Sequence, residues 1–249
     1  MIRIAKYIAD SGLCSRRAAC RLIESGQVQL NDRVAIHTDR VSNDDTIVVN
    51  GQTISPPAEH RYYLYNKPVG IDCVCNPQDA DSIVHQINTP VRVFPVGRLD
   101  KDSHGLMLLT NDGELCQRLL HPDYYHEKEY RVTVDKRLTD PFLETMSLGV
   151  SYNISGKKVT TLPCQIKRQS DSIFLITLTQ GMNRQIRRMC KVLGYRVTGL
   201  QRLRMESLQL GDLPFNQLQP LSSDQVLQLK RQTVDLPQRN GMMPNLIFT

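Results

Sequence analysis

Tryptophan is absent from this 249-residue sequence, and aromatic residues make up only 6% of it. So few flat side chains argue against an extended platform on which nucleic-acid bases stack in series. Long apolar runs are also missing, since none approaches the roughly 20 residues that a helix needs to cross a bilayer. The first residues, MIRIAKYIADSGLCSRR, alternate charged with apolar side chains and lack the apolar core of a signal peptide. We therefore expect a cytoplasmic protein with no membrane partner.

The sequence also lacks the common motifs for metals and cofactors. It has seven cysteines but no CxxC pair. Cys73 and Cys75 form a CxC, without a second His or Cys pair at the spacing of a zinc site. Neither a phosphate-binding P-loop nor a GxGxxG dinucleotide motif is present. We expect reduced thiols, no metal and no small-molecule cofactor.

Positive charge is concentrated in two segments. The chain has 31 Lys and Arg against 25 Asp and Glu, which gives a formal net charge of +6. Residues 1–21 hold five basic side chains and one acid, and residues 180–204 hold seven basic side chains and no acid. A solvated helix face usually mixes both signs, so the clusters predict a nucleic-acid partner. The candidate contacts of the first cluster are Arg3, Lys6, Arg16 and Arg17.

Apolar periodicity predicts a small N-terminal unit, residues 1–55. Apolar residues at i, i+3 and i+4 indicate two short helices, the second capped by Ser15, and short strands follow them. Pro56 and Pro57 then mark a linker over residues 56–61.

A larger unit follows at residues 62–235, and a tail without clear periodicity at 236–249. Strands are expected at 62–65, 91–96, 105–110, 129–134, 159–167 and 172–179, and helices at 112–120, 139–147, 181–193 and 222–231. Strands outnumber helices and do not alternate with them regularly, so the pattern predicts an α+β fold.

The densest group of polar residues lies in VGRLDKDSHGLMLLTNDG, residues 96–113. Gly97 and Gly105 bracket a tight loop between two apolar strands. The polar residues of this loop are Arg98, Asp100, Asp102, Ser103 and His104. Such a loop beside a β core is typical of catalytic groups on a rigid scaffold. On spacing alone, a charged surface turn in which Asp100 bonds backbone amides is the simpler interpretation.

The second basic cluster contains TQGMNRQIRRMCKVLGY, residues 179–195. Its apolar residues fall on one face of a helix, and its basic residues spread over the rest. The basic residues are Arg184, Arg187, Arg188 and Lys191. A positive helix start beside a carboxylate loop would hold RNA phosphates and supply a counter-ion for a catalytic aspartate. The alternative is a solvated basic face.

A third segment, HEKEYRVTVD at residues 126–135, reads as a strand. Tyr130, Val132 and Val134 alternate and so share one face. Taken alone, Tyr130 is a core or half-exposed aromatic residue.

Together these segments resemble a known family. SGLCSRRAACRLIESGQVQLN, residues 11–31, resembles the αL RNA-binding fold of ribosomal protein S4. Four further blocks resemble the RsuA-type RNA pseudouridine synthases. They are NKPVG (66–70), GRLDKDSHGL (97–106), KEYRV (128–132) and GMNRQIRRM (181–189). The resemblance implies an S4-like domain followed by a catalytic domain with a mixed, mostly antiparallel sheet.

The resemblance also implies roles for individual residues. Asp100 would be the catalytic residue, Tyr130 would stack on the target uracil, and Arg187 would pair with Asp100. Arg184 and Arg188 would bind phosphates. For Arg98 and Lys67 a neighbouring role in the site and a structural role remain equally open.

The implied reaction converts uridine to pseudouridine in 23S ribosomal RNA, free or in an assembling subunit, without a cofactor. The target nucleotide would be flipped out of its stack. Two alternatives stay open: the same chemistry on 16S RNA or tRNA, and a non-catalytic RNA-binding factor in ribosome assembly. An intact set of Asp100, Tyr130 and Arg187 favours the enzyme.

Overall fold

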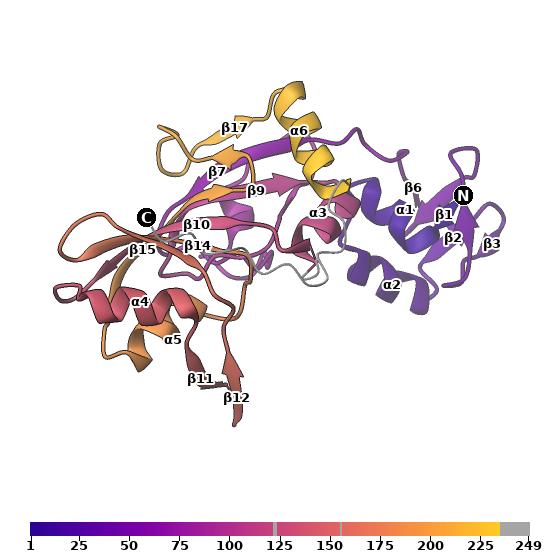
Figure 1. Cartoon of the computed structure of the whole chain (residues 1–249). Coiled ribbons are helices and arrows are strands. Elements are labelled where there is room, and N and C mark those ends of the chain that lie inside the picture. Colours follow the sequence, from indigo (N-terminus) through magenta and orange to yellow (C-terminus); the bar gives the residue numbers. More distant parts are fainter. Residues whose placement is uncertain (122–123, 155, 235–249) are drawn as a thin grey trace. The chain divides into compact units, whose positions relative to one another are not determined.

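The computed structural model describes residues 1–121, 124–154 and 156–234 (Figure 1). The expected tail, 236–249, lies outside the described residues. The chain forms two compact units. The smaller comprises Met1–Tyr62, Asn88–Phe94 and Thr110–Asp112, and the larger comprises Tyr63–Ile87, Pro95–Leu109 and the chain from Gly113 onward.

Two helices form the first part of the smaller unit, as the periodicity predicts. They are α1 (Ile4–Asp10) and α2 (Arg16–Glu24), preceded by the short strand β1 (Ile2–Arg3). Ser15 caps α2, because its hydroxyl accepts a hydrogen bond from the Ala18 amide at 3.2 Å. The buried side chains of the two helices are Ile4, Ala5, Tyr7, Ile8, Ala19 and Ile23.

Short strands complete this unit. They are β2 (Val28–Leu30), β3 (Arg33–Val34), β4 (Arg40–Val41), β5 (Ile47–Val49) and β6 (Gln52–Thr53). β4 pairs with β1, and the other four form a sheet in the order β3-β2-β5-β6. Asn50 adopts a positive φ of 51°, which allows the tight turn predicted between β5 and β6.

A nine-stranded sheet forms the centre of the larger unit. Its main path is β13-β14-β10-β15-β9-β7-β17, with β16 on β15 and β8 on β9. The strands are β7 (Tyr62–Lys67), β8 (Phe94–Pro95), β9 (His104–Thr110), β10 (Lys128–Val134), β13 (Gln165–Arg168), β14 (Ile173–Leu178), β15 (Val197–Met205), β16 (Leu208–Gln209) and β17 (Leu218–Pro220). β9 and β15 run parallel, whereas β10 is antiparallel to both of its neighbours. The expected mixed, mostly antiparallel sheet is thereby confirmed.

Helices pack on this sheet. They are α3 (Gly113–Leu120), α4 (Asp140–Leu148), α5 (Gln185–Val192) and α6 (Ser223–Val234), and a 3₁₀ turn lies at Ile83–His85. Figure 1 shows α4 and α5 on one side of β10, β14 and β15. There Phe142 and Met146 of α4 and Met189 of α5 join one apolar core with Val132 and Phe174 of the sheet. Each such side chain contributes roughly 1.5–3 kcal/mol when it is fully buried.

Several strand expectations differ from the structure. The strand expected at 91–96 is only β8, Phe94–Pro95, and the short strands β11 (Ser151–Ile154), β16 and β17 were not predicted. The predicted strand 159–167 is two strands, β13 and the hairpin strand β12 (Lys157–Thr160), which pairs with β11. Pro163 lies between them and cannot donate to a ladder. β15 was not predicted at all, although it pairs with both β10 and β9. Its inward position 202 is an arginine, which hides the apolar alternation.

Candidate active site

The loop of residues 97–103, called here the Asp100 loop, connects β8 to β9. Gly97 and Gly105 flank it with positive φ values of 76° and 106°. A Cβ atom at Gly105 would overlap the backbone of Arg202 on β15. Glycine is therefore required where β9 meets β15, and this close approach fixes the point from which the loop leaves the sheet.

Arg184 is the basic residue that reaches Asp100. Its Nη1 lies 3.5 Å from Asp100 Oδ2, and its two terminal nitrogens bond both carboxylate oxygens of Asp102 at 3.1 and 2.8 Å. These bonds lower the pKa of the Asp102 carboxyl. The sequence led us to expect Arg187 as the direct partner of Asp100 and Arg184 as a phosphate contact. The structure gives the contact with Asp100 to Arg184.

Arg187 holds the backbone of the Asp100 loop instead. Its Nη2 donates to the Asp102 carbonyl at 2.9 Å and to Ser103 Oγ at 3.2 Å, and its Nη1 donates to the Val197 carbonyl at 3.2 Å. Nη2 also lies 3.4 Å from Asp102 Oδ1. The side chain is only 13% exposed, and this burial lowers the guanidinium pKa. Arg187 thus ties the loop to the start of β15.

Arg184, rather than Arg187, reaches Asp100 because of the backbone conformation just before α5. The helix begins at Gln185 and not at 181 as predicted. Arg184 is its N-cap residue, with a left-handed φ of 51°. Gln185 Oε1 accepts a bond from the Met182 amide at 3.0 Å, which stabilises this turn. The left-handed residue turns the Arg184 side chain toward the Asp100 loop, a direction that a regular helix pattern does not predict.

Lys67 supports the same loop from β7. Its side chain is fully buried, and Nζ donates to the carbonyls of Pro68 at 2.9 Å and Ser103 at 2.8 Å. Burial lowers the pKa of this ammonium. These contacts favour the structural interpretation that the sequence left open for Lys67.

Tyr130 lies on β10 between two neighbours, Ile176 of β14 and Arg202 of β15. Val132 and Val134 on the same face are buried in the core, and the partly buried ring of Tyr130 packs against that core. The predicted shared face is thereby confirmed.

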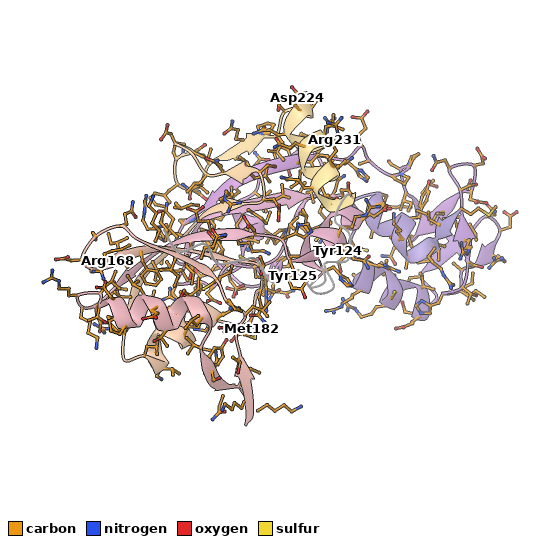
Figure 2. The ribbon with its side chains drawn as sticks, in the orientation of Figure 1. Tyr124, Tyr125, Arg168, Met182, Asp224 and Arg231 are labelled. Atoms are coloured by element: carbon orange, nitrogen blue, oxygen red, sulfur yellow. The ribbon has the colours of Figure 1, made fainter. Side chains whose placement is uncertain are left out.

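A single cleft of about 730 Å³ contains Asp100, Tyr130 and Arg184 in its lining. It is lined by the Asp100 loop, the start of β10 and the segment before α5. Its polar lining includes Arg98, Asp100, Tyr130, Arg184, His126, Lys128 and Arg202. Figure 2 labels Tyr125 and Met182, two lining residues that come from the segments before β10 and before α5.

The remaining predicted contacts fall in different places. Arg98 is exposed and lines the cleft. Arg188 bonds the carbonyl and side chain of Asn183 at 3.0 and 3.3 Å. In the smaller unit, Lys6 pairs with Asp10 at 2.6 Å. Arg3 donates to the His37 carbonyl at 3.4 Å, and Arg16 and Arg17 are exposed.

The second basic cluster is partly neutralised by acids from elsewhere in the chain. Arg196 pairs with Asp135 at 3.7 Å, and Arg204 pairs with Glu127 at 2.8 Å. Arg202 is buried. Strand pairing of β15 with β10 brings these carboxylates beside the cluster, so part of the positive charge at residues 180–204 is paired within the chain.

Sequence reasoning missed several residues of the cleft. His126, Lys128 and Arg202 are among them. Lys128 stands two positions before Tyr130, and this alternation was the available signal. Arg202 was hidden because β15 was not recognised as a strand.

No group of three or more His, Cys, Asp and Glu among the described residues is placed to hold a metal ion. None of their helices is long and apolar enough to cross a membrane.

Known proteins share both the domain order and this fold. A family model described as RNA pseudouridylate synthase matches residues 61–191, and a model of the S4 domain matches residues 2–38. The chain belongs to the RsuA-type RNA pseudouridine synthases. It is 45% identical over 230 residues to the dual-specificity RNA pseudouridine synthase RluF of Escherichia coli (strain K12), covering 92% of this chain and 78% of that protein.

Two further matches agree with this family. The ribosomal large subunit pseudouridine synthase B of Bacillus subtilis (strain 168) is 35% identical, over 92% of this chain and 96% of that one. A crystal structure of a pseudouridylate synthase, 27% identical, superposes with a TM-score of 0.67 and covers 92% of this chain and all of the other. The predicted family, domain order and enzyme class are thereby confirmed.

Proposed function

We propose that this pseudouridine synthase acts on a specific uridine of 23S ribosomal RNA, with Asp100 as the catalytic residue. The observation that carries the proposal is the position of Asp100, in the cleft and 3.5 Å from the guanidinium of Arg184. A carboxylate held by a cation and open to a cleft can approach a ribose, whereas a surface turn needs neither partner nor cleft.

The cleft is large enough for one nucleotide that has left its helical stack. Flipping a uridine costs a few kcal/mol, which contacts to flanking phosphates offset. Asp100 then acts at the sugar, and Tyr130 stacks on the uracil. Arg184 and Arg187 keep the Asp100 loop in place. Exposed Arg98, partly buried Arg188 and the basic residues of the S4 domain contact phosphates.

The assignment to 23S RNA rests on relatives rather than on a readable code. One similar enzyme is named for the large ribosomal subunit, and RluF is named for dual specificity. RNA targets are selected by shape and loop contacts. The same chemistry on 16S RNA or tRNA is the alternative. Ribosomal RNA as substrate also implies that the protein works in the cytoplasm, on free RNA or on assembling subunits.

Tritium release tests the role of Asp100. Ribosomal RNA carrying tritium at uridine C5, from a strain without the gene, should release tritium with the wild type and not with Asp100→Asn. RNA affinity should stay equal. Asp171→Asn, at a 75% exposed carboxylate, is the matched control and should behave as the wild type. Equal release from Asp100→Asn would remove Asp100 from the mechanism, and mapping the new pseudouridine decides between 23S, 16S and tRNA.

A further inference from the structure

Two cationic side chains line the cleft without a role in holding the Asp100 loop. Arg202 of β15 is 2% exposed, and Lys128 of β10 is partly buried. In the ladder between these strands, Tyr130 stands opposite Arg202. Lys128 and Tyr130 are two positions apart on β10, with a register shift of the β10–β15 pairing between Glu129 and Tyr130. Lys128, Tyr130 and Arg202 all line the cleft, so both cations lie near the ring proposed to stack on the target base.

Neither cation forms an ion pair among the described residues, although Glu206 is near enough for its charge to act on Lys128. Lys128 Nζ donates to the His126 carbonyl at 3.0 Å. Arg202 Nε donates to the Leu106 carbonyl at 2.7 Å, and its Nη2 lies 2.9 Å from Met107 Sδ. No described carboxylate forms an ion pair with either group.

The acids closest to Lys128 are occupied by other donors. Glu206 accepts from the Glu127 amide at 2.7 Å and from His126 Nδ1 at 3.0 Å. Glu127 itself pairs with Arg204. Burial, together with the nearby charge of Arg202, lowers the pKa of Lys128 to about 8. A buried cation without a partner is destabilising, so the cleft is arranged to receive negative charge.

The reaction produces negative charge at the base. When the C1′–N1 bond breaks, its electron pair leaves with the uracil, and the charge spreads over N1, O2 and O4. The ring then rotates, and C5 forms the new bond to C1′ with an electron pair of the ring. C5 loses a proton and N1 gains one, so uridine and pseudouridine balance without an oxidant or another reactant. The anion exists only between the two bond changes.

We propose that Lys128, with Arg202 behind it, stabilises the negative charge of the detached uracil. The ammonium has three N–H groups, and His126 takes one of them, which leaves two for the uracil oxygens. Arg202 is fixed by the Leu106 carbonyl and acts through its charge rather than by contact. The inference rests on the proposed function, because it requires the target base to enter this cleft.

Single-turnover tritium release with excess enzyme separates this role from RNA binding. Lys128→Met should slow release by about 10²–10³-fold, the loss typical of removing one donor to a developing anion. Its RNA affinity should stay within twofold of the wild type. Lys128→Arg keeps the charge and should retain most of the rate. Lys167→Met, at an exposed lysine of β13, is the matched control and should be unchanged.

The pH profile gives a second readout that does not depend on removing the side chain. The groups around Lys128 are Arg202 on β15, Glu206 after it, His126 before β10, and Asp100 in the same cleft. Wild-type turnover should fall above about pH 8, as the ammonium loses its proton. Lys128→Arg should not show this fall. An identical fall in both proteins would overturn the proposal, even if Lys128→Met does not fold.

Two further outcomes would contradict the proposal. If Lys128→Met releases tritium at the wild-type rate but loses affinity, with a salt slope lower by about one, Lys128 binds a phosphate. If rate and affinity are both unchanged, Lys128 has no role. Asp100→Asn, assayed in parallel, distinguishes failure of the role of Lys128 from failure of the role proposed for Asp100. No release from Asp100→Asn with full release from Lys128→Met rejects only this inference, whereas full release from both also rejects the role proposed for Asp100.

Discussion

Replacing Lys128 by methionine should make the protein more stable while it slows the reaction. At pH 7 the folded protein must keep this buried ammonium charged, although its pKa falls from 10.5 to about 8 on folding. That difference corresponds to about 3 kcal/mol of lost stability. The hydrogen bond to the His126 carbonyl returns roughly 1 kcal/mol. Lys128→Met, similar in length and uncharged, should therefore gain about 2 kcal/mol.

The pH dependence fixes the sign of this effect. Because the pKa of Lys128 is lowered in the folded state, the unfolded chain binds more protons between about pH 8 and 10.5. Wild-type stability should rise across this window relative to Lys128→Met. The stability advantage of Lys128→Met over the wild type is thus complete below about pH 8 and lost near pH 10.

Thermal unfolding of the larger unit measures the difference. A gain of about 2 kcal/mol should raise its melting temperature by roughly 4–8 °C at pH 7. Lys167→Met, at an exposed position, should leave it within about a degree. Equal or lower stability of Lys128→Met at pH 7 would refute the argument that this cation is buried without compensation.

Two further predictions concern the other basic residues. Arg184→Gln removes the cation beside Asp100 and should lower turnover at saturating RNA at least tenfold. Arg188, whose side chain bonds Asn183 in its own turn, is the control, and Arg188→Gln should stay within about threefold of the wild type. Tritium release compares the two variants, and equal rates would contradict the role of Arg184. Arg16→Ala combined with Arg17→Ala should weaken RNA binding and reduce the slope of log affinity against log salt by up to about 2, with turnover at saturating RNA little changed; an unchanged slope would mean that the S4 domain does not hold phosphates through these side chains.

Local signals predicted the elements that depend on local physics. Ser15 caps α2 because an N-cap needs only its own neighbouring amides. Tyr130, Val132 and Val134 share a face because alternation along a strand is a local property. The Asp100 loop was found because its two glycines mark its ends.

Features that depend on distant partners were not predictable in the same way. β15 was not predicted because Arg202 takes an inward position, where its Nε donates to the Leu106 carbonyl, 96 residues away in sequence. The contact of Arg184, rather than Arg187, with Asp100 depends on the left-handed backbone conformation of Arg184 just before α5. Charge neutralisation of Arg204 by Glu127 depends on strand pairing.

The Asp100 loop is tethered from two separate elements. Lys67 holds the Ser103 carbonyl from β7, while Arg184 and Arg187 hold Asp102 and its carbonyl from α5. Opening the loop would break all of these bonds together and leave the buried Lys67 ammonium with its bond to the Pro68 carbonyl but without the Ser103 carbonyl. Under the proposed function the loop is thus preformed, and most of the bending, melting and base extrusion would fall to the RNA that enters the cleft.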